Sequence, residues 1–121
     1  MLPKKFRLTL NNDIKMVREN GKPFLTKLFN FKIKNNNLKQ SRFCIIISGK
    51  VDKRAVIKNR IKRQISEIVR LNMDNIKSGY DISILVKNNL MDKDAKKIAC
   101  DYKEMEKNIL FAFDKMNLLK S

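Results

Sequence analysis

The sequence predicts one domain of the mixed α/β (α+β) class, folded as a two-layer sandwich with a four-stranded sheet. A chain of 121 residues suits a single domain with one core. Apolar residues alternate with polar ones in segments 29–34 and 80–87, which is the period of a half-buried strand. Elsewhere they recur every three or four residues, as in helices that pack on a sheet. The expected order is α-β-β-β-α-β-α.

The N-terminal third predicts a helix followed by two strands. The stretch NNDIKMVRENG favours a short helix over residues 12–20, because Asn residues begin helices and Gly21 can serve as the left-handed residue that ends one. The alternation of Phe29, Phe31 and Ile33 with polar residues predicts a strand, preceded by a short strand near residues 23–25.

The middle of the chain predicts a strand, a helix and another strand. Residues 35–41, NNNLKQS, indicate a polar hairpin loop, and RFCIIIS (42–48) is β-branched and apolar on both faces, so we expect it to be central in the sheet. Asp52 can cap a helix that runs to about Leu71. In YDISILVK, one face then carries Tyr80, Ile82, Ile84 and Val86.

The C-terminal segment predicts a long helix over residues 92–119, because its apolar positions, Ala95 among them, keep three-and-four spacing. We expect it to pack on the sheet through Ile98, Tyr102, Met105 and Ile109.

Net charge is the strongest global signal for function. The chain has 28 Lys and Arg against 12 Asp and Glu, a formal charge of +16. So many positive side chains repel one another in a compact fold. Binding to a polyanionic partner is the commonest reason that a protein carries such an excess. Nucleic acid is favoured over an anionic membrane. The sequence has no run of about 18 apolar residues and no signal-peptide pattern, so we expect a cytoplasmic protein without a membrane partner.

Catalytic and metal-binding residues are not expected. The chain has no His, and Cys44 and Cys100 show no CxxC spacing, so packed free thiols are favoured over a redox or metal role. The carboxylates are scattered. Asp101, Glu104 and Glu106 alternate with lysines, which indicates surface ion pairs. We expect no cofactor bound by the protein itself.

The helix around KRAVIKNRIKRQISEIVR combines an apolar stripe with a cationic face. The stripe consists of Ile57, Ile61, Ile65, Ile68 and Leu71, with Val69 at its edge. The opposite face and first turn carry Lys50, Lys53, Arg54, Lys58, Asn59, Arg60, Lys62, Arg63, Ser66 and Arg70. Cations at a helix N-terminus oppose the helix dipole, so a phosphate-binding face is favoured over a merely solvated one.

This helix resembles the hallmark of the protein component of bacterial ribonuclease P, a stretch like K-x-x-x-x-A-V-x-R-N-R-x-K-R-x-x-R-E. The matching residues are Lys50, Ala55, Val56, Lys58, Asn59, Arg60, Ile61, Lys62, Arg63 and Glu67. RLTLNNDIKMVRENG and YDISILVK are similar to the family's opening segment and to its later strand.

The resemblance implies a small RNA-binding subunit, monomeric in the holoenzyme, that assists a catalytic RNA in removing the 5′ leader of precursor tRNA. The RNA would hold the required Mg²⁺ and carry out the chemistry. The basic face of the central helix would contact this RNA. The resemblance also implies a left-handed β-α-β crossover between the last two strands of the sheet, like that of a small ribosomal domain, although general rules favour the right hand.

The resemblance further implies a cleft between the first helix and the sheet that takes the single-stranded leader. Its candidate residues are Phe6, Arg7, Ile14, Arg18, Phe29, Phe31, Lys32 and Phe43. The three sheet Phe residues fit a plain core equally well. Ile14 and Arg18 stand where the family favours aromatic residues, which predicts leader binding by charge more than by stacking.

Other positions depart from the family pattern in the basic segment. Lys58 replaces an Arg and so lacks its bidentate fork, Gly49 replaces a Lys, and Ser66 replaces a common Arg.

The alternative interpretation is a ribosomal or other structural RNA- or DNA-binding protein without an enzymatic context. A basic helix could enter a DNA major groove, but it would need a short helix packed before it, and the sequence offers a strand instead.

Overall fold

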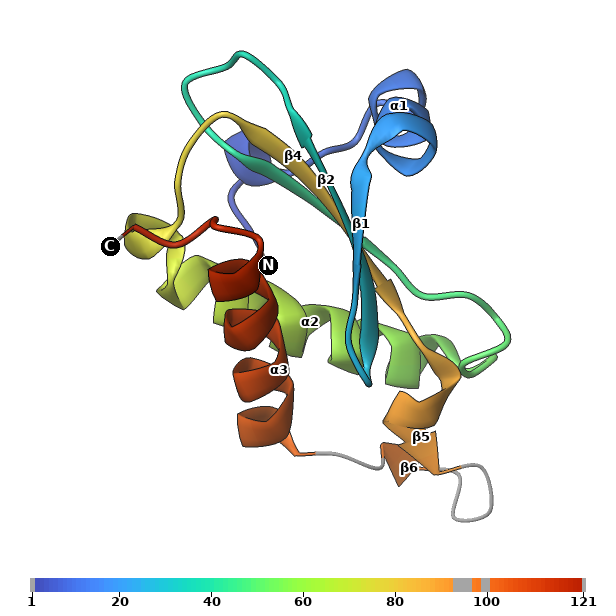
Figure 1. Ribbon diagram of the computed structural model, residues 1–121. Helices are drawn as coiled ribbons and strands as arrows, with labels where there is room; N and C mark the ends of the chain where they lie inside the picture. The colour runs from blue at the N-terminus through green and yellow to red at the C-terminus, as the bar shows by residue number, and fades with distance from the viewer. Residues whose placement is uncertain (1, 93–96, 99–100, 121) are drawn as a thin grey trace.

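The computed structural model describes residues 2–92, 97–98 and 101–120 and shows a mixed α/β fold built on a four-stranded sheet (Figure 1). The sheet consists of β1 (Lys22–Leu25), β2 (Phe29–Asn35), β3 (Arg42–Ile46) and β4 (Tyr80–Val86), in the spatial order β1-β2-β4-β3. β1 and β4 pair antiparallel with β2, and β3 pairs parallel with β4. The predicted α/β class and four-stranded sheet are confirmed.

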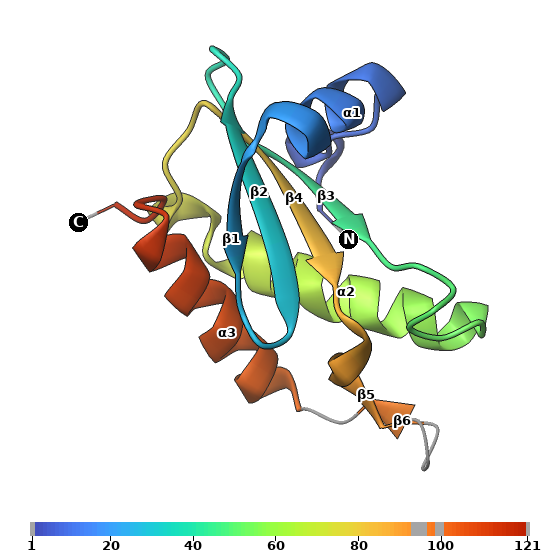
Figure 2. The same ribbon diagram turned by 45° about the vertical axis from the view of Figure 1, so that its right-hand side comes forward.

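Two helices cover one face of the sheet and a third lies on the other (Figure 2). α2 (Ala55–Leu71) and α3 (Tyr102–Lys115) form the helical layer, and α1 (Asn11–Asn20) lies across the opposite face. Short 3-10 turns occur at Lys4–Phe6, Met73–Asn75 and Asn88–Leu90, and a small ladder joins β5 (Met91–Asp92) to β6 (Lys97–Ile98).

The core lies between the sheet and the α2–α3 layer. Its fully buried large side chains include Phe29, Phe31, Phe113, Ile61, Ile65, Ile68, Ile82, Ile84, Met105 and Ile109. The strand residues in this set alternate along β2 and β4, so a period of two brings them all to one face. Burial of each such side chain is worth about 1.5–3 kcal/mol, which makes this layer the main source of stability.

The predicted place of the strand after the polar loop was wrong. β3 is an edge strand, and β4 lies between it and β2, so residues 35–41 do not form a hairpin. β3 is apolar on both faces because each face is partly covered. Phe43 lies in the core, and the backbone N–H of Leu8 donates to the Phe43 carbonyl along the free edge (2.8 Å). The connection from β3 through α2 to β4 is a β-α-β crossover, whose left hand stays a prediction.

α1 agrees with the predicted helix to within one residue, but its end is built differently. Gly21 has an extended φ of −70° rather than a left-handed one, so the prediction of a left-handed end was wrong. The residue is tightly enclosed instead: a Cβ built on it would lie 2.3 Å from the carbonyl oxygen of Val17, which accepts the Gly21 N–H. Close approach, rather than positive φ, therefore favours glycine here.

α2 is rotated about its axis relative to the prediction. Ser66, assigned to the basic face, is 3% exposed, whereas Leu71, assigned to the apolar stripe, is 58% exposed. Val69, expected at the edge, is fully buried beside Ile61, Ile65 and Ile68. The predicted cap also differs: Arg54 is the residue before the helix, and Asp52 accepts its backbone N–H (2.7 Å) without capping the first turn.

The predicted long C-terminal helix begins about ten residues later than expected. α3 starts at Tyr102, where the Asp101 carboxylate caps it by accepting the Glu104 N–H (2.8 Å). Ile98, expected on this helix, lies in β6, while Met105 and Ile109 are fully buried as predicted. Ala95 and Cys100 lie outside the described residues.

Among the residues that the structure describes, no helix combines the length and apolarity needed to cross a membrane.

Candidate nucleic-acid interface

The basic segment predicted to bind RNA lies on and just before α2. We call it the α2 basic surface; it comprises Lys50, Lys53, Arg54, Lys58, Asn59, Arg60, Lys62 and Arg63. All are exposed except Lys58 and Lys62, which are half-buried. They lie on the part of α2 turned away from its buried Ile residues, because these side chains occupy the other side of the turn. The core thus orients the cations toward solvent.

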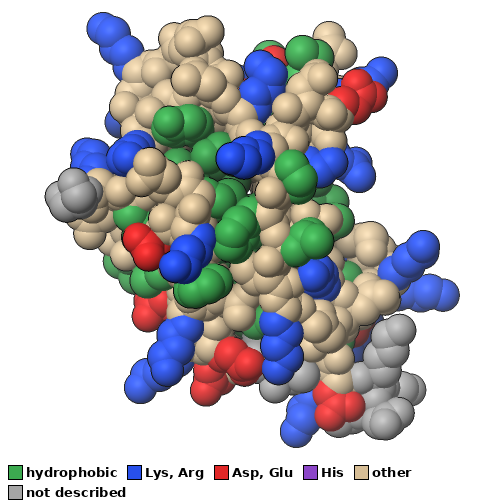
Figure 3. Space-filling model, in the orientation of Figure 1, with side chains coloured by type: hydrophobic (Ala, Val, Ile, Leu, Met, Phe, Trp, Pro, Cys, Tyr) green, Lys and Arg blue, Asp and Glu red, His purple; other side chains and the backbone are tan. Residues whose placement is uncertain are grey.

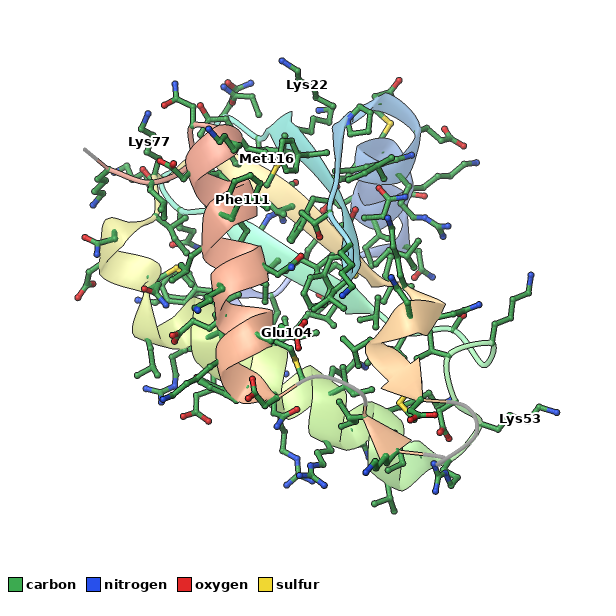
Figure 4. The ribbon with its side chains drawn as sticks, turned by 60° about the horizontal axis from the view of Figure 1, so that its bottom comes forward. Lys22, Lys53, Lys77, Glu104, Phe111 and Met116 are labelled. Carbon is green, nitrogen blue, oxygen red and sulfur yellow. The ribbon has the colours of Figure 1, made fainter. Side chains whose placement is uncertain are left out.

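The entry to α2 is ordered by one ion pair. The Arg54 guanidinium donates to both carboxylate oxygens of Asp52, at 3.0 Å from Nε and 2.8 Å from Nη2. The hydrogen bonds from Arg54 hold the pKa of Asp52 at about 2. Lys53 extends away from the body of the molecule beside this pair (Figure 4). The pair therefore fixes the loop, while the neighbouring cations stay available to phosphates.

Arg70, predicted as part of the same face, lies two helical turns beyond Arg63, toward the other end of α2. It is one residue from the C-terminal end of α2, close enough to Tyr102 of α3 to influence that hydroxyl electrostatically together with Glu67. Burial is the main cause that raises the pKa of Tyr102, and Glu67 and Glu106 add to it. Arg70 thus faces a surface with acidic neighbours.

The face over α3 and β1 is of mixed character (Figure 3). Its apolar centre includes Phe111, which is 55% exposed, stands 6.5 Å from the Phe24 ring and has the Lys115 ammonium above it. Figure 4 shows Phe111 of α3 near Met116, which directly follows the helix, with Glu104 toward the helix start. Acidic and basic side chains alternate along this helix, so the cationic excess is stronger at α2.

A pocket connects the α2 basic surface with the opposite face of the sheet. Lys62 lines it together with Arg7 and Thr9 of the N-terminal segment and Cys44 of β3. Burial raises the pKa of the Cys44 thiol, against the opposing effect of Lys62 and Arg18. Cys44 is thus a half-buried free thiol between α1 and α2, and the cations around it come from three separate segments.

Pockets lie between α1 and the outer face of the sheet, in the region where the resemblance implies a leader-binding cleft. Strand register places Lys32, Ser83 and Cys44 in one row, and Asn30, Leu85 and Ile46 in the next. Pockets here are lined by all residues of these rows except Cys44, and by the side of α1. We call this region the α1–sheet cleft; its lining includes Ile14, Arg18, Asn30, Lys32, Ile46, Ser83 and Leu85.

Four of the predicted leader-binding residues lie at this cleft or beside it. Ile14 and Arg18 project from α1, Lys32 from β2, and Arg7 lies exposed near Lys62. The Lys32 ammonium also donates a hydrogen bond to the Arg18 carbonyl at the end of α1. Lys32 therefore anchors the helix as well as adding charge.

The aromatic candidates lie elsewhere. Phe29, Phe31 and Phe43 point into the core and are at most 2% exposed, so no ring face is open to a base. Their assignment to the cleft was wrong, and the alternative interpretation as core residues fits the structure. Phe6 is half-buried at the rim of the core, with the Lys5 ammonium 5.0 Å from its ring centroid.

Several cleft residues were missed by the sequence analysis. Asn30, Ile46, Ser83 and Leu85 all alternate with core residues along their strands. The same period of two that identified the core face also defines the other face, so this signal was available. The outer face was not recognised because it mixes polar and apolar residues, and Ile46 and Leu85 resemble core residues.

Carboxylates near these surfaces are engaged by arginines. Asp52 pairs with Arg54, and Asp81 pairs with Arg42. Within the described part of the chain, no three His, Cys, Asp or Glu side chains gather where they could hold a metal ion.

Comparison with known proteins identifies the family. The family model described as Ribonuclease P matches residues 2–110. The "Ribonuclease P protein component" of Alkaliphilus oremlandii is 36% identical over 115 residues, covering 95% of this chain and 94% of the relative. That of Clostridium novyi is 39% identical over 122 residues, covering 98% and 95%.

Solved structures show the same fold. The RNase P protein of Thermotoga maritima superposes with a TM-score of 0.79 at 25% identity, covering 90% of this chain and 96% of that one. A Staphylococcus aureus RNase P protein mutant with defective mRNA degradation activity gives 0.82 at 22% identity, covering 95% and 91%. With the sequence matches across nearly the whole length, these likenesses show that the chain belongs to the family of bacterial ribonuclease P protein components.

Proposed function

We propose that this protein is the accessory subunit of a ribonuclease P holoenzyme and assists the removal of the 5′ leader from precursor tRNA. Membership of the family supports this role. The α2 basic surface binds the catalytic RNA, and the α1–sheet cleft takes the single-stranded leader. Mg²⁺ belongs to the RNA, which performs the hydrolysis, and the protein binds no cofactor by itself. One copy of the protein acts in each holoenzyme, in the cytoplasm.

The observation that carries this proposal is the continuity of the two surfaces. Lys62 belongs to the α2 basic surface and also lines the pocket that holds Arg7 and Cys44. Arg18 is near enough to Cys44 to influence its thiol, and it lines the cleft beside Lys32. A single strand leaving a helix bound at α2 would therefore follow cations into the cleft, and phosphate contacts of this kind dominate affinity for nucleic acids.

The geometry assigns different tasks to the two surfaces. Exposed Arg residues such as Arg60 and Arg63 can grip phosphates of a folded RNA with charge-assisted hydrogen bonds. The cleft has cations at its walls and a floor of Asn30, Ser83 and Leu85 without an accessible aromatic ring. Such a floor tracks the leader backbone and reads little of its base sequence.

Reconstitution with a bacterial ribonuclease P RNA tests the proposal. We expect the purified protein to restore cleavage of precursor tRNA at low Mg²⁺, and the protein alone to show no cleavage. The alternative, a structural RNA-binding protein, predicts RNA binding without restored cleavage. Cleavage at the mature 5′ end by an RNA-free sample would contradict the assignment of chemistry to the RNA.

A further inference from the structure

Three charged side chains link α1 to the sheet through hydrogen bonds. None of the three is among the candidate leader-binding residues. The Arg42 guanidinium donates two hydrogen bonds to Asp81, from Nε to Oδ1 (2.9 Å) and from Nη2 to Oδ2 (2.7 Å). Its remaining nitrogen, Nη1, reaches Oδ2 of Asp13 on α1 (3.4 Å). We call Asp13, Arg42 and Asp81 the Arg42 bridge.

The inner half of the bridge is rigid. The Asp81 side chain is 8% exposed, and its Oδ1 also accepts a hydrogen bond from the Asn36 side-chain amide (2.8 Å). A bidentate pair with a further donor fixes both the carboxylate and the guanidinium plane. Arg42 therefore presents Nη1 to α1 in one defined direction.

The outer half of the bridge contributes to orientation more than to stability. The Asp13 side chain is 36% exposed, and exposed ion pairs of this kind add little to folding stability. α1 has only one buried residue in its described length, Val17, which provides a pivot rather than a broad contact. Without the bridge, α1 would keep this pivot, the Lys32 anchor at its C-terminal end and the Leu8–Phe43 hydrogen bond that holds the chain just before it. None of these three contacts fixes the rotation of the helix about its own axis.

The cleft depends on that orientation. Ile14 and Arg18 lie one turn apart on α1 and line the cleft, and Asp13 directly precedes Ile14. Any rotation that separates Asp13 from Arg42 also moves Ile14 and Arg18 relative to the fixed row of Lys32, Ser83 and Cys44. The distance between the cation on the helix and the cations on the sheet thus depends on the bridge.

We propose that the Arg42 bridge positions α1 so that the α1–sheet cleft is matched to the leader, with Asp13, Arg42 and Asp81 acting as positioning residues. This inference rests on the proposed leader-binding function. Asp13 therefore increases affinity for an anionic leader even though its own charge repels phosphates.

Because the charge of Asp13 repels phosphates, its removal would raise affinity for the leader if charge alone mattered and lower it if the bridge matters. The direction of the change therefore tests the proposal. The measured quantity is the leader gain, the ratio of holoenzyme affinities for precursor tRNAs with a ten-nucleotide and a one-nucleotide leader. Asp13→Ala should lower the gain by about threefold or more, within the range of coupling between neighbouring groups. Glu19→Ala is the matched control: Glu19 carries the same charge on the same helix and lines the cleft, but it forms no ion pair with the residues that the structure describes, so its removal should leave the gain equal or raise it.

Arg42→Lys provides a second variant. It keeps the charge, but one ammonium cannot serve both carboxylates in this geometry, so the gain should again fall. Affinity for the one-nucleotide leader should not change with Asp13→Ala, and neither should the melting temperature beyond that of Glu19→Ala. A purely structural role would not alter the ratio of the two affinities.

The outcomes separate the inference from the function on which it rests. If the unmodified protein shows a leader gain and Asp13→Ala behaves like Glu19→Ala, the positioning role of the bridge is overturned. If the unmodified protein shows no leader gain at all, the proposed leader binding is itself wrong, and the role of the bridge in it falls as well.

Discussion

Phe31 of β2 packs edge-on against Phe113 of α3, with ring centroids 5.9 Å apart and ring planes at 67°. The ring of Phe29 lies 5.8 Å from Phe31 on the same face of the sheet, and Phe43 reaches Phe113 at 6.1 Å. These four aromatic rings join three structural elements across the core. Their role is to hold the sheet to α3, and none of them lines the α1–sheet cleft where leader binding is proposed.

Phe31→Ala should therefore destabilise the fold without changing leader recognition. A buried aromatic truncation costs about 3–5 kcal/mol of unfolding free energy. Urea denaturation measures that loss, and the leader gain of the remaining folded protein should equal that of the unmodified protein. Phe6→Ala, at the core rim, is the comparison and should cost less stability. A stable Phe31→Ala protein with a reduced leader gain would mean that the ring meets the leader.

Arg60→Ala and Arg63→Ala should each weaken binding to the catalytic RNA by about 1–3 kcal/mol, the range for charge-assisted contacts. Both side chains are exposed, so thermal melting should not change. Arg70→Ala is the matched control, because Arg70 lies beside Glu67 and Tyr102, and its effect on RNA affinity should be smaller. Filter binding at fixed salt gives these affinities, and equal losses for all three variants would contradict the separation of Arg70 from the α2 basic surface.

Ile61→Ala should have the reverse effect on the same helix. Ile61 is fully buried, and a large-to-small change there costs about 2–5 kcal/mol of stability. Chemical denaturation checks the loss. Leu71→Ala, on the same helix but 58% exposed, is the control and should cost far less. The opposite ranking would mean that α2 is rotated differently from the structure.

Leader binding should depend on salt. Arg7, Arg18 and Lys62 are three cations near the cleft, and each single-strand phosphate contact contributes about 0.7 to the log-log slope of affinity against salt. The slope for a long leader should therefore be steeper than that for a one-nucleotide leader by about 2. Titration of the holoenzyme over a salt series measures the difference. A leader gain that does not vary with salt would indicate stacking on an aromatic residue instead.

The Asp52–Arg54 pair should persist to low pH. The pKa of Asp52 is lowered from 3.8 to about 2, chiefly by the hydrogen bonds from Arg54. A lowered folded-state pKa means that the pair contributes fully above the ordinary value and is lost as the pH falls through about 2. A carboxyl-detected NMR titration should report this value in the free protein. Arg54→Ala should return it toward 3.8, and an unchanged low value in that variant would assign the shift to another group.

The sequence was sufficient for the class of fold, for the ends of α1, β2 and β4, which apolar periodicity marks, and for the approximate position of the short strand β1. It could not place β3. Apolar residues on both faces usually indicate a central strand. Here α1, α2 and the N-terminal segment shield the apolar residues of β3, and such contacts between distant segments cannot be seen in the local sequence. The order of the strands in the sheet depends on the crossover through α2, and no local sequence pattern predicts that order.

The candidate site was predictable in part for the same reason. The cations of α2 follow helical spacing and were found directly, whereas Ser66 looked polar and exposed but is buried beside the Cys44 pocket. Cleft residues such as Asn30 and Ser83 are unremarkable in the sequence and gain their role only from strand register. Asp13 and Arg42 are 29 residues apart, so nothing short of the folded sheet brings them together.

The hydrogen bond from Leu8 to Phe43 along β3 has a consequence for how the folded protein behaves toward other copies of itself. An open sheet edge invites a strand from another copy, and this is a common first step in aggregation. The N-terminal segment covers part of the β3 edge, and Pro23 removes one backbone donor from β1 at the opposite edge. Together with the repulsion between copies that carry a formal charge of +16, these two features disfavour edge-to-edge association of the folded protein.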